Sequence, residues 1–189
     1  MTGSTHEDLY ESVFATITMK KLIDSHSHNI YLKPGEVVIS REPVLISTVL
    51  GSCVAVTMFS PGKGIGAICH AMLPDNTGRA VDLRYVDTAL RHLYLKIVEY
   101  GAEKDLIVKM FGGAQVLDVG NCEQPRRTIG DQNVASALEI LDSLRLTVYS
   151  ADTGGLVGRK LFFCTRHGDV FVRRMGKKLI KGGCHEFSN

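Results

Sequence analysis

The sequence predicts a mixed α+β domain in which helices lie outside packed sheets. Strand-like segments come first along the chain, and helical segments then alternate with single strands. The 189 residues are 44% hydrophobic and 22% charged, which suits one domain that buries a core without disulfides or a structural metal. A net charge of +2 gives no general attraction to nucleic acid, so a nucleic-acid-binding function is not expected.

The N-terminal half of the domain is expected to be rich in strands. β-branched residues dominate residues 36–40 and 44–50, and Pro43 breaks the run between them. Residues 54–59 and 65–70 are two further short apolar segments, and the turn-forming Ser-Pro-Gly-Lys-Gly between them predicts a hairpin. We expect these four strands to be neighbours and to form much of one sheet.

Two helices and further strands are expected in the C-terminal half. Apolar residues follow helical spacing over residues 82–100 and again over 131–144. Asp131 is placed to cap or charge the start of the second helix, where free N–H groups could otherwise bind an anion. The remaining strands are predicted at residues 106–111, 145–150, 160–165 and 170–174.

Cys53 and His70 are the strongest candidate functional residues. Gly51 and Ser52 precede the cysteine, and small residues let the backbone turn sharply and leave N–H groups free to face a ligand. The predicted hairpin would place the thiol and the imidazole side by side. An imidazole can take the thiol proton, which is the first step of nucleophilic catalysis. A buried structural cysteine is the alternative, and spacing alone does not exclude it.

The five cysteines, at positions 53, 69, 122, 164 and 184, favour a reducing compartment. Their number is odd and no Cys-x-x-Cys pair occurs, so a disulfide framework is not expected and the cytoplasm fits best. Neither a secretory signal nor an apolar run long enough to span a bilayer is expected. His26 and His28 have no third ligand nearby in sequence, so metal binding is not expected there.

Six ordered motifs resemble those of the CheD family of chemoreceptor glutamine deamidases. They are YLKPGE at 31–36, LGSCVAV at 50–56, HAMLP at 70–74, FGGA at 111–114, IGDQN at 129–133 and DTGG at 152–155. The resemblance runs from about Tyr31 to Met175. It implies a β-sandwich-like core of mixed sheets flanked by helices, cysteine-hydrolase-like, in a single CheD-like deamidase domain at residues 29–175. Residues 1–28 are then a partly ordered N-terminal extension and residues 176–189 a flexible basic tail.

The resemblance also implies a reaction, the hydrolysis of glutamine side-chain amides of methyl-accepting chemotaxis receptors to glutamate and ammonia. Cys53 is expected to attack the amide carbon, and His70 to move the protons. Backbone N–H groups near Gly51 and Ser52 are expected to support the oxyanion. The reaction needs no metal and no organic cofactor.

A hydroxyl residue completes the Cys–His pair in the family. The resemblance places a threonine six residues before the cysteine, and Ser47 stands at that position here. Because serine keeps a hydroxyl that can orient His70, the third role is assigned to Ser47. Thr48 is the alternative hydroxyl, although adjacent residues in a strand face opposite sides.

The expected partners follow from the resemblance. Receptor glutamines lie on helical surfaces, so the site should be an open groove, bordered by the polar loop at residues 75–79. A CheC-type phosphatase is a further possible partner. Two alternatives stay open: a non-catalytic or slow adaptor that binds receptors and such a phosphatase, and a cysteine protease or transglutaminase-like acyl transferase that shares the nucleophile.

Overall fold

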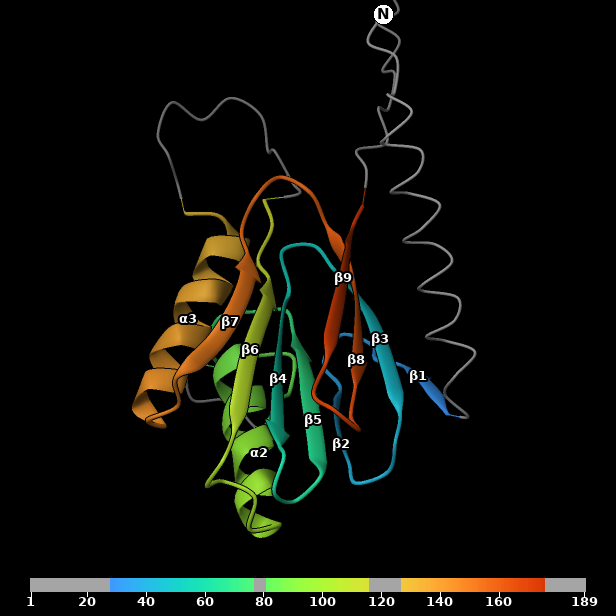
Figure 1. Ribbon diagram of the computed structural model, residues 1–189. Coiled ribbons are helices and arrows are strands. Elements are labelled where there is room, and N and C mark those ends of the chain that lie inside the picture. Colours follow the sequence, from blue (N-terminus) through green and yellow to red (C-terminus); the bar gives the residue numbers. More distant parts are fainter. Residues whose placement is uncertain (1–27, 77–80, 116–126, 176–189) are drawn as a thin grey trace, which may run out of the picture.

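The computed structural model describes residues 28–76, 81–115 and 127–175. Among these residues, a pair of sheets packs face to face, and two helices cover the outer face of one of them (Figure 1). The helices are α2 (Val86–Glu99) and α3 (Ile129–Ser143). The strands are β1 (Asn29–Tyr31), β2 (Val37–Ser40), β3 (Leu45–Leu50), β4 (Val54–Ser60), β5 (Ile65–Ala71), β6 (Ile107–Gly112), β7 (Val148–Thr153), β8 (Arg159–Cys164) and β9 (Val170–Arg174).

The larger sheet has the strand order β2-β5-β4-β6-β7 and the smaller one β1-β3-β8-β9. Every residue of β4 and β5 is buried, because this hairpin lies in the middle of the molecule. One of its faces, with Val56 and Met58, packs on α2 and α3, and the other, with Ala55 and Ile68, packs on the smaller sheet. The predicted mixed α+β fold with packed sheets and outer helices is therefore confirmed.

One expectation about the strands is wrong. β3 does not join the β4–β5 hairpin in one sheet; it pairs with β1 and β8 in the other. The chain changes sheets just after β2, where Val44 N–H donates to the Thr165 hydroxyl at 2.8 Å and Thr165 N–H donates to the Val44 carbonyl at 3.0 Å. Since Thr165 is 121 residues away in sequence, this pairing left no local signal.

The helix boundaries also differ from the expected ones. α2 begins at Val86 rather than at 82, because Tyr85 keeps an extended backbone. α3 begins two residues before Asp131 because Thr128 is the N-cap. The Thr128 hydroxyl accepts from Asp131 N–H, and the Asp131 carboxylate accepts from Thr128 N–H at 3.0 Å, so the two form a capping box. Asp131 therefore supports the cap and is not the cap itself.

β7 begins at Val148, three residues later than expected. Arg145, just after α3, adopts a positive φ of 56°, and its N–H donates to the Asp142 carbonyl, so the chain turns before it becomes extended. The expected N-terminal extension, apart from His28, and the expected basic tail lie outside the described residues. None of the helices among the described residues is long and apolar enough to cross a membrane.

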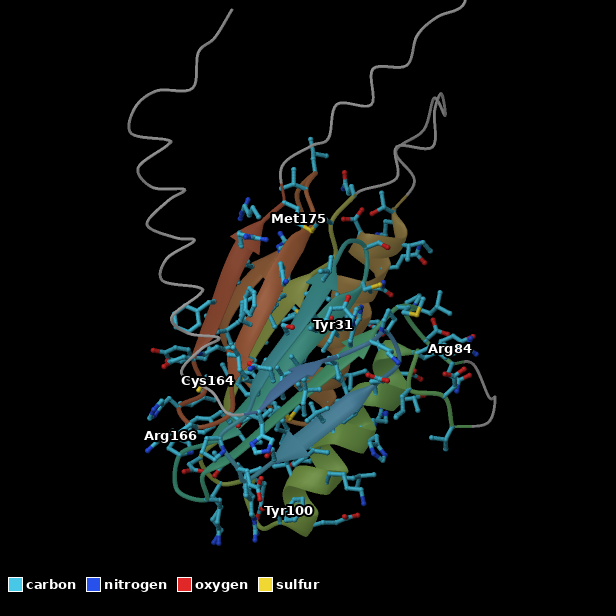
Figure 2. The ribbon with its side chains drawn as sticks, turned by 90° about the vertical axis from the view of Figure 1, so that its right-hand side faces the viewer. Tyr31, Arg84, Tyr100, Cys164, Arg166 and Met175 are labelled. Carbon is cyan, nitrogen blue, oxygen red and sulfur yellow. The ribbon has the colours of Figure 1, made fainter. Side chains whose placement is uncertain are left out.

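The two ends of the sandwich differ in what they carry. Met175, which follows β9, lies at one end, and Cys164 and Arg166 lie toward the other (Figure 2). The register pairs Leu50 with Arg159, and Arg159 with Arg174, so the end of β3 lies at the Met175 end. The chain from the end of β3 to the start of β4, which includes Cys53, therefore lies at this end.

Candidate active site

Cys53 and His70 lie at the open end of the β4–β5 hairpin. The register pairs Ala55 with His70, and Cys53 comes two residues before Ala55. Alternate residues of an extended chain share a face, and Cys53 packs with Ala55 against the apolar layer between the sheets. His70 is 1% exposed, whereas Cys53 is only half-buried. The thiol is therefore accessible at the rim of the layer into which the imidazole is inserted.

The hydroxyl of Thr48 holds the imidazole from the opposite sheet. Thr48 Oγ1 lies 2.8 Å from His70 Nδ1 and also donates to the Leu32 carbonyl at 2.8 Å. A hydroxyl has one proton to donate, and the Leu32 carbonyl takes it. The His70 Nδ1 must then carry a proton and donate it to Thr48. In the neutral imidazole this leaves Nε2 unprotonated.

The Nε2 atom of His70 is buried and has no hydrogen-bond partner among the described residues. Burial lowers the pKa of His70, and the Leu32 carbonyl and the charge of Glu36 offset this only in part. Burial also raises the pKa of the Cys53 thiol, opposed by its own backbone N–H. Both shifts favour a resting pair of neutral thiol and neutral imidazole, with a free base at Nε2.

Of the two hydroxyl residues considered for the third role, the structure brings Thr48 and not Ser47 to the imidazole. Ser47 does not contact His70; it pairs with Tyr31 and Phe162 and faces away from the layer between the sheets. Thr48, the alternative, is fully buried and makes the contact. Ser47 and Thr48 are adjacent in β3 and therefore face opposite sides of the smaller sheet, and Thr48 is on the side that faces His70.

The turn that carries Gly51, Ser52 and Cys53 is held through its carbonyl groups. Ala114 N–H donates to the Gly51 carbonyl and Gly113 N–H to the Cys53 carbonyl, both at 2.8 Å. In a trans peptide the N–H of the next residue points the opposite way to the carbonyl. The contact of Ala114 with the Gly51 carbonyl therefore turns the N–H of Ser52 away from Ala114.

The turn fits closely against Gly112 at the end of β6. Gly112 has a positive φ of 110°, and a Cβ atom there would overlap the Cys53 carbonyl oxygen and press on Val54. Two features therefore require glycine at position 112: the positive φ and the close approach of the Cys53 backbone. This contact accounts for the first glycine of the Phe-Gly-Gly-Ala motif.

Sequence reasoning missed two buried polar residues that support the turn. Arg159, 1% exposed, donates to the Gly112 carbonyl at 2.8 Å, to the Gly154 carbonyl at 2.8 Å and to Asp152 Oδ1 at 3.0 Å. Asn133, fully buried on α3, reaches the Ser52 carbonyl at 2.9 Å. Asn133 lies in one of the motifs, which was a usable signal, whereas nothing in the sequence indicates that Arg159 is buried.

A groove of about 580 Å³ lies behind the end of β5, lined by Gly35, Asn76 and residues 81–85. Gly35 N–H donates to the His70 carbonyl at 2.7 Å, so the groove reaches the strand that carries the imidazole. Of the polar loop expected to border the site, residues 75 and 76 are described and the others are not. Among the described residues, no group of three His, Cys, Asp or Glu side chains is close enough to hold a metal ion.

Comparisons with known proteins show which proteins this chain is similar to. The family model described as CheD chemotactic sensory transduction matches residues 72–174. A probable chemoreceptor glutamine deamidase CheD of Maridesulfovibrio salexigens is 43% identical over 165 residues, which cover 82% of this chain and 97% of that protein. Its counterpart named CheD 2 in Geobacter sulfurreducens is 41% identical, covering 79% and 91%, and one from Methanococcus maripaludis is 34% identical, covering 76% and 93%.

These relatives are matched along nearly their whole length, and their identity to this chain is 34–43%. The resemblance drawn from the six motifs is thus confirmed, and the chain belongs to the CheD family.

Proposed function

We propose that this protein is a chemoreceptor glutamine deamidase, a protein-glutamine glutaminase that converts receptor glutamines to glutamate and ammonia. The relatives that carry this name support the activity. The observation that carries the proposal is the contact of Thr48 Oγ1 with His70 Nδ1, because it leaves a basic Nε2 in the layer against which Cys53 packs.

In the first half of the reaction, His70 Nε2 takes the proton of the Cys53 thiol as Sγ attacks the side-chain amide carbon of glutamine. The S–C bond forms and the amide oxygen becomes an oxyanion, which backbone N–H groups of the Ser52–Cys53 turn stabilise. The intermediate collapses when the C–N bond breaks. The nitrogen takes the proton from Nε2 and leaves as ammonia, and a thioester remains.

In the second half, His70 Nε2 takes a proton from water, and the resulting hydroxide attacks the thioester carbon. The S–C bond breaks, the Cys53 sulfur regains the proton from Nε2, and glutamate is released. The sum is one water consumed and one ammonia formed for each glutamine. No oxidant and no reductant takes part.

The adaptor alternative rested on the absence of a threonine at the position six residues before the cysteine. The contact of Thr48 Oγ1 with His70 provides a hydroxyl from the next position, which supports catalysis over the adaptor. The substrates in our proposal are the cytoplasmic regions of methyl-accepting chemotaxis receptors, which places the protein in the cytoplasm. A CheC-type phosphatase as a second partner also belongs to the proposal, and it rests on the family resemblance.

The test is mass spectrometry of a purified chemoreceptor cytoplasmic fragment after incubation with the protein, with ammonia measured in the same samples. The expected result is conversion of particular glutamines to glutamate by the wild type and none by Cys53→Ala or His70→Ala. Receptor that binds but keeps every glutamine would favour the adaptor. Peptide fragments would indicate a protease, and incorporation of an added amine an acyl transferase.

Cys69→Ala is a matched control for the nucleophile. Cys69 is next to His70 in sequence, but it is 1% exposed and packs in the core against the helices. Burial raises the pKa of its thiol to about 11, so it is a poor nucleophile. The Cys69→Ala variant should keep the activity that Cys53→Ala loses.

A further inference from the structure

Asn133 joins the two segments that carry the catalytic pair. Its Nδ2 donates to the Ser52 carbonyl and to the Met72 carbonyl, both at 2.9 Å. Ser52 is the residue before Cys53, and Met72 is two residues after His70. One amide group on α3 therefore fixes the turn at the nucleophile relative to the end of the strand that carries the base.

The other half of the same amide is left unsatisfied. Asn133 Oδ1 is buried and has no hydrogen-bond partner among the described residues, and the side chain is 0% exposed. A buried polar atom without a partner lowers stability. An asparagine kept at this cost is explained by its two donated hydrogen bonds and by what they orient.

The bond to the Ser52 carbonyl sets the direction of the next N–H group. Ser52 and Cys53 share one planar trans peptide, so a carbonyl drawn toward α3 turns the Cys53 N–H away from α3. That N–H lies beside the Cys53 sulfur, where it opposes the rise in the thiol pKa. An N–H group beside the attacking sulfur is where the oxyanion forms when a carbonyl carbon is attacked.

We infer that Asn133 is a positioning residue that aims the Cys53 N–H at the oxyanion of the tetrahedral intermediate. This inference rests on the proposed deamidase function. It goes beyond that function because it separates two tasks at one turn. Thr48 and His70 activate the thiol, and Asn133 orients the Cys53 N–H that donates to the oxyanion.

The test compares two reactions of the same sulfur. Alkylation of Cys53 by iodoacetamide requires the thiolate but forms no oxyanion, whereas deamidation of a receptor fragment requires both. Asn133→Leu keeps the approximate size of the side chain and removes both donors. We expect deamidation kcat to fall by at least about tenfold, whereas the alkylation rate at Cys53, followed on its tryptic peptide, should fall by no more than about threefold, because the redirected N–H also supports the thiolate.

Ser136→Ala is the matched control. Ser136 lies on the same helix and donates to the Pro74 carbonyl at 2.5 Å, so it also ties α3 to the segment after β5 but does not touch the turn at Cys53. It should leave both rates within about twofold. Thermal unfolding of each variant checks the fold. If the leucine variant does not fold, Asn133→Ser replaces it; serine keeps one donor, so the same difference between the two rates is expected, but a smaller one.

The outcomes are distinct. Equal losses of deamidation and alkylation in Asn133→Leu, or no loss of either, would overturn the role of Asn133 while the wild-type activity stands. A wild type whose Cys53 is alkylated normally but which deamidates no glutamine would overturn the proposed function, and this role with it. A loss of deamidation much greater than the loss of alkylation supports both.

Discussion

Thr48 Oγ1 and His70 Nδ1 meet at 2.8 Å across the boundary between two sheets. Thr48 belongs to β3 of the smaller sheet and His70 to β5 of the larger one. The proton of the threonine hydroxyl goes to the Leu32 carbonyl, so the hydroxyl can only accept from the imidazole. In the proposed mechanism, this one contact sets which nitrogen of His70 acts as the base.

Thr48→Val should lower deamidation kcat by about 10- to 100-fold, because valine keeps the shape but cannot accept from Nδ1, so the tautomer is no longer fixed. Thr48→Ser should recover most of the activity. Steady-state kinetics on a receptor fragment measure this, with circular dichroism to check the fold.

The control for Thr48 is its neighbour. Ser47→Ala removes a hydroxyl from the opposite face of the same strand and should change kcat by less than about twofold. If Ser47→Ala were the damaging change and Thr48→Val harmless, the assignment of the third residue to Thr48 would be wrong.

The rate of Cys53 alkylation by iodoacetamide should keep rising with pH to above pH 9, because burial raises the pKa of this thiol. A rate that reaches a plateau below about pH 7 would instead mean that the resting pair is a thiolate and an imidazolium. The measurement is the alkylation rate of the Cys53 peptide as a function of pH.

Deamidation and stability should both decrease on the acid side of pH 6.5. The pKa of His70 is lowered in the folded protein, so between this pKa and 6.5 the unfolded chain binds more protons than the folded one. Stability contributed by neutral His70 is present above pH 6.5 and is lost as pH falls through the lowered pKa, and the base at Nε2 is lost with it. Urea unfolding at several pH values checks the sign, and in His70→Ala this component of the pH dependence should be absent.

Gly112→Ala should destabilise the protein by about 3 kcal/mol or more and abolish deamidation, because the new Cβ atom collides with the backbone of Cys53 and Val54 at a positive φ. Gly155→Ala is the matched control, since Gly155 has a positive φ of 76° but open space around it. It should cost only about 1 kcal/mol, from backbone strain alone. Denaturant unfolding of the two variants separates collision from strain; equal losses would contradict the close fit at Cys53.

Arg159→Ala should destabilise the protein by about 3 kcal/mol and lower activity, because it removes the buried donor of the Gly154 carbonyl and leaves the Gly112 carbonyl with the Gly154 N–H alone. Arg174 provides the comparison. It contacts the same Asp152 Oδ1 at the same 3.0 Å, but its side chain is 64% exposed. Arg174→Ala should cost no more than about 1 kcal/mol. Similar unfolding midpoints for the two variants would refute a supporting role for Arg159.

Local pattern was enough to predict the hairpin of β4 and β5, both helices and the candidate pair at its open end. These features depend on residues close together in sequence, such as the turn between the two strands and the apolar spacing of α2. The sheet to which β3 belongs could not be predicted in this way, because it depends on a partner strand more than a hundred residues away. The choice between Ser47 and Thr48 depended on that same partner.

Buried polar residues were the other features that the sequence did not reveal. Arg159 follows a glycine-rich loop, and arginine is usually found on the surface. It is nevertheless buried, because three acceptors converge on its guanidinium. Asn133 was noted only as part of a motif at the start of a helix, with no role of its own. Its position in the second turn of α3 places its amide against the Ser52 and Met72 carbonyls, which follows from how the helix packs on the sheet.

In the proposed mechanism, the base and its orienting hydroxyl lie in different sheets, which links catalytic competence to the completion of folding. A chain in which only the β4–β5 hairpin has formed holds the cysteine and the histidine, but it has no threonine to select the basic nitrogen and no second sheet to exclude water from the imidazole. A nascent or partly unfolded molecule therefore cannot modify the glutamines of proteins it meets by chance. In this mechanism, only the fully folded protein is active.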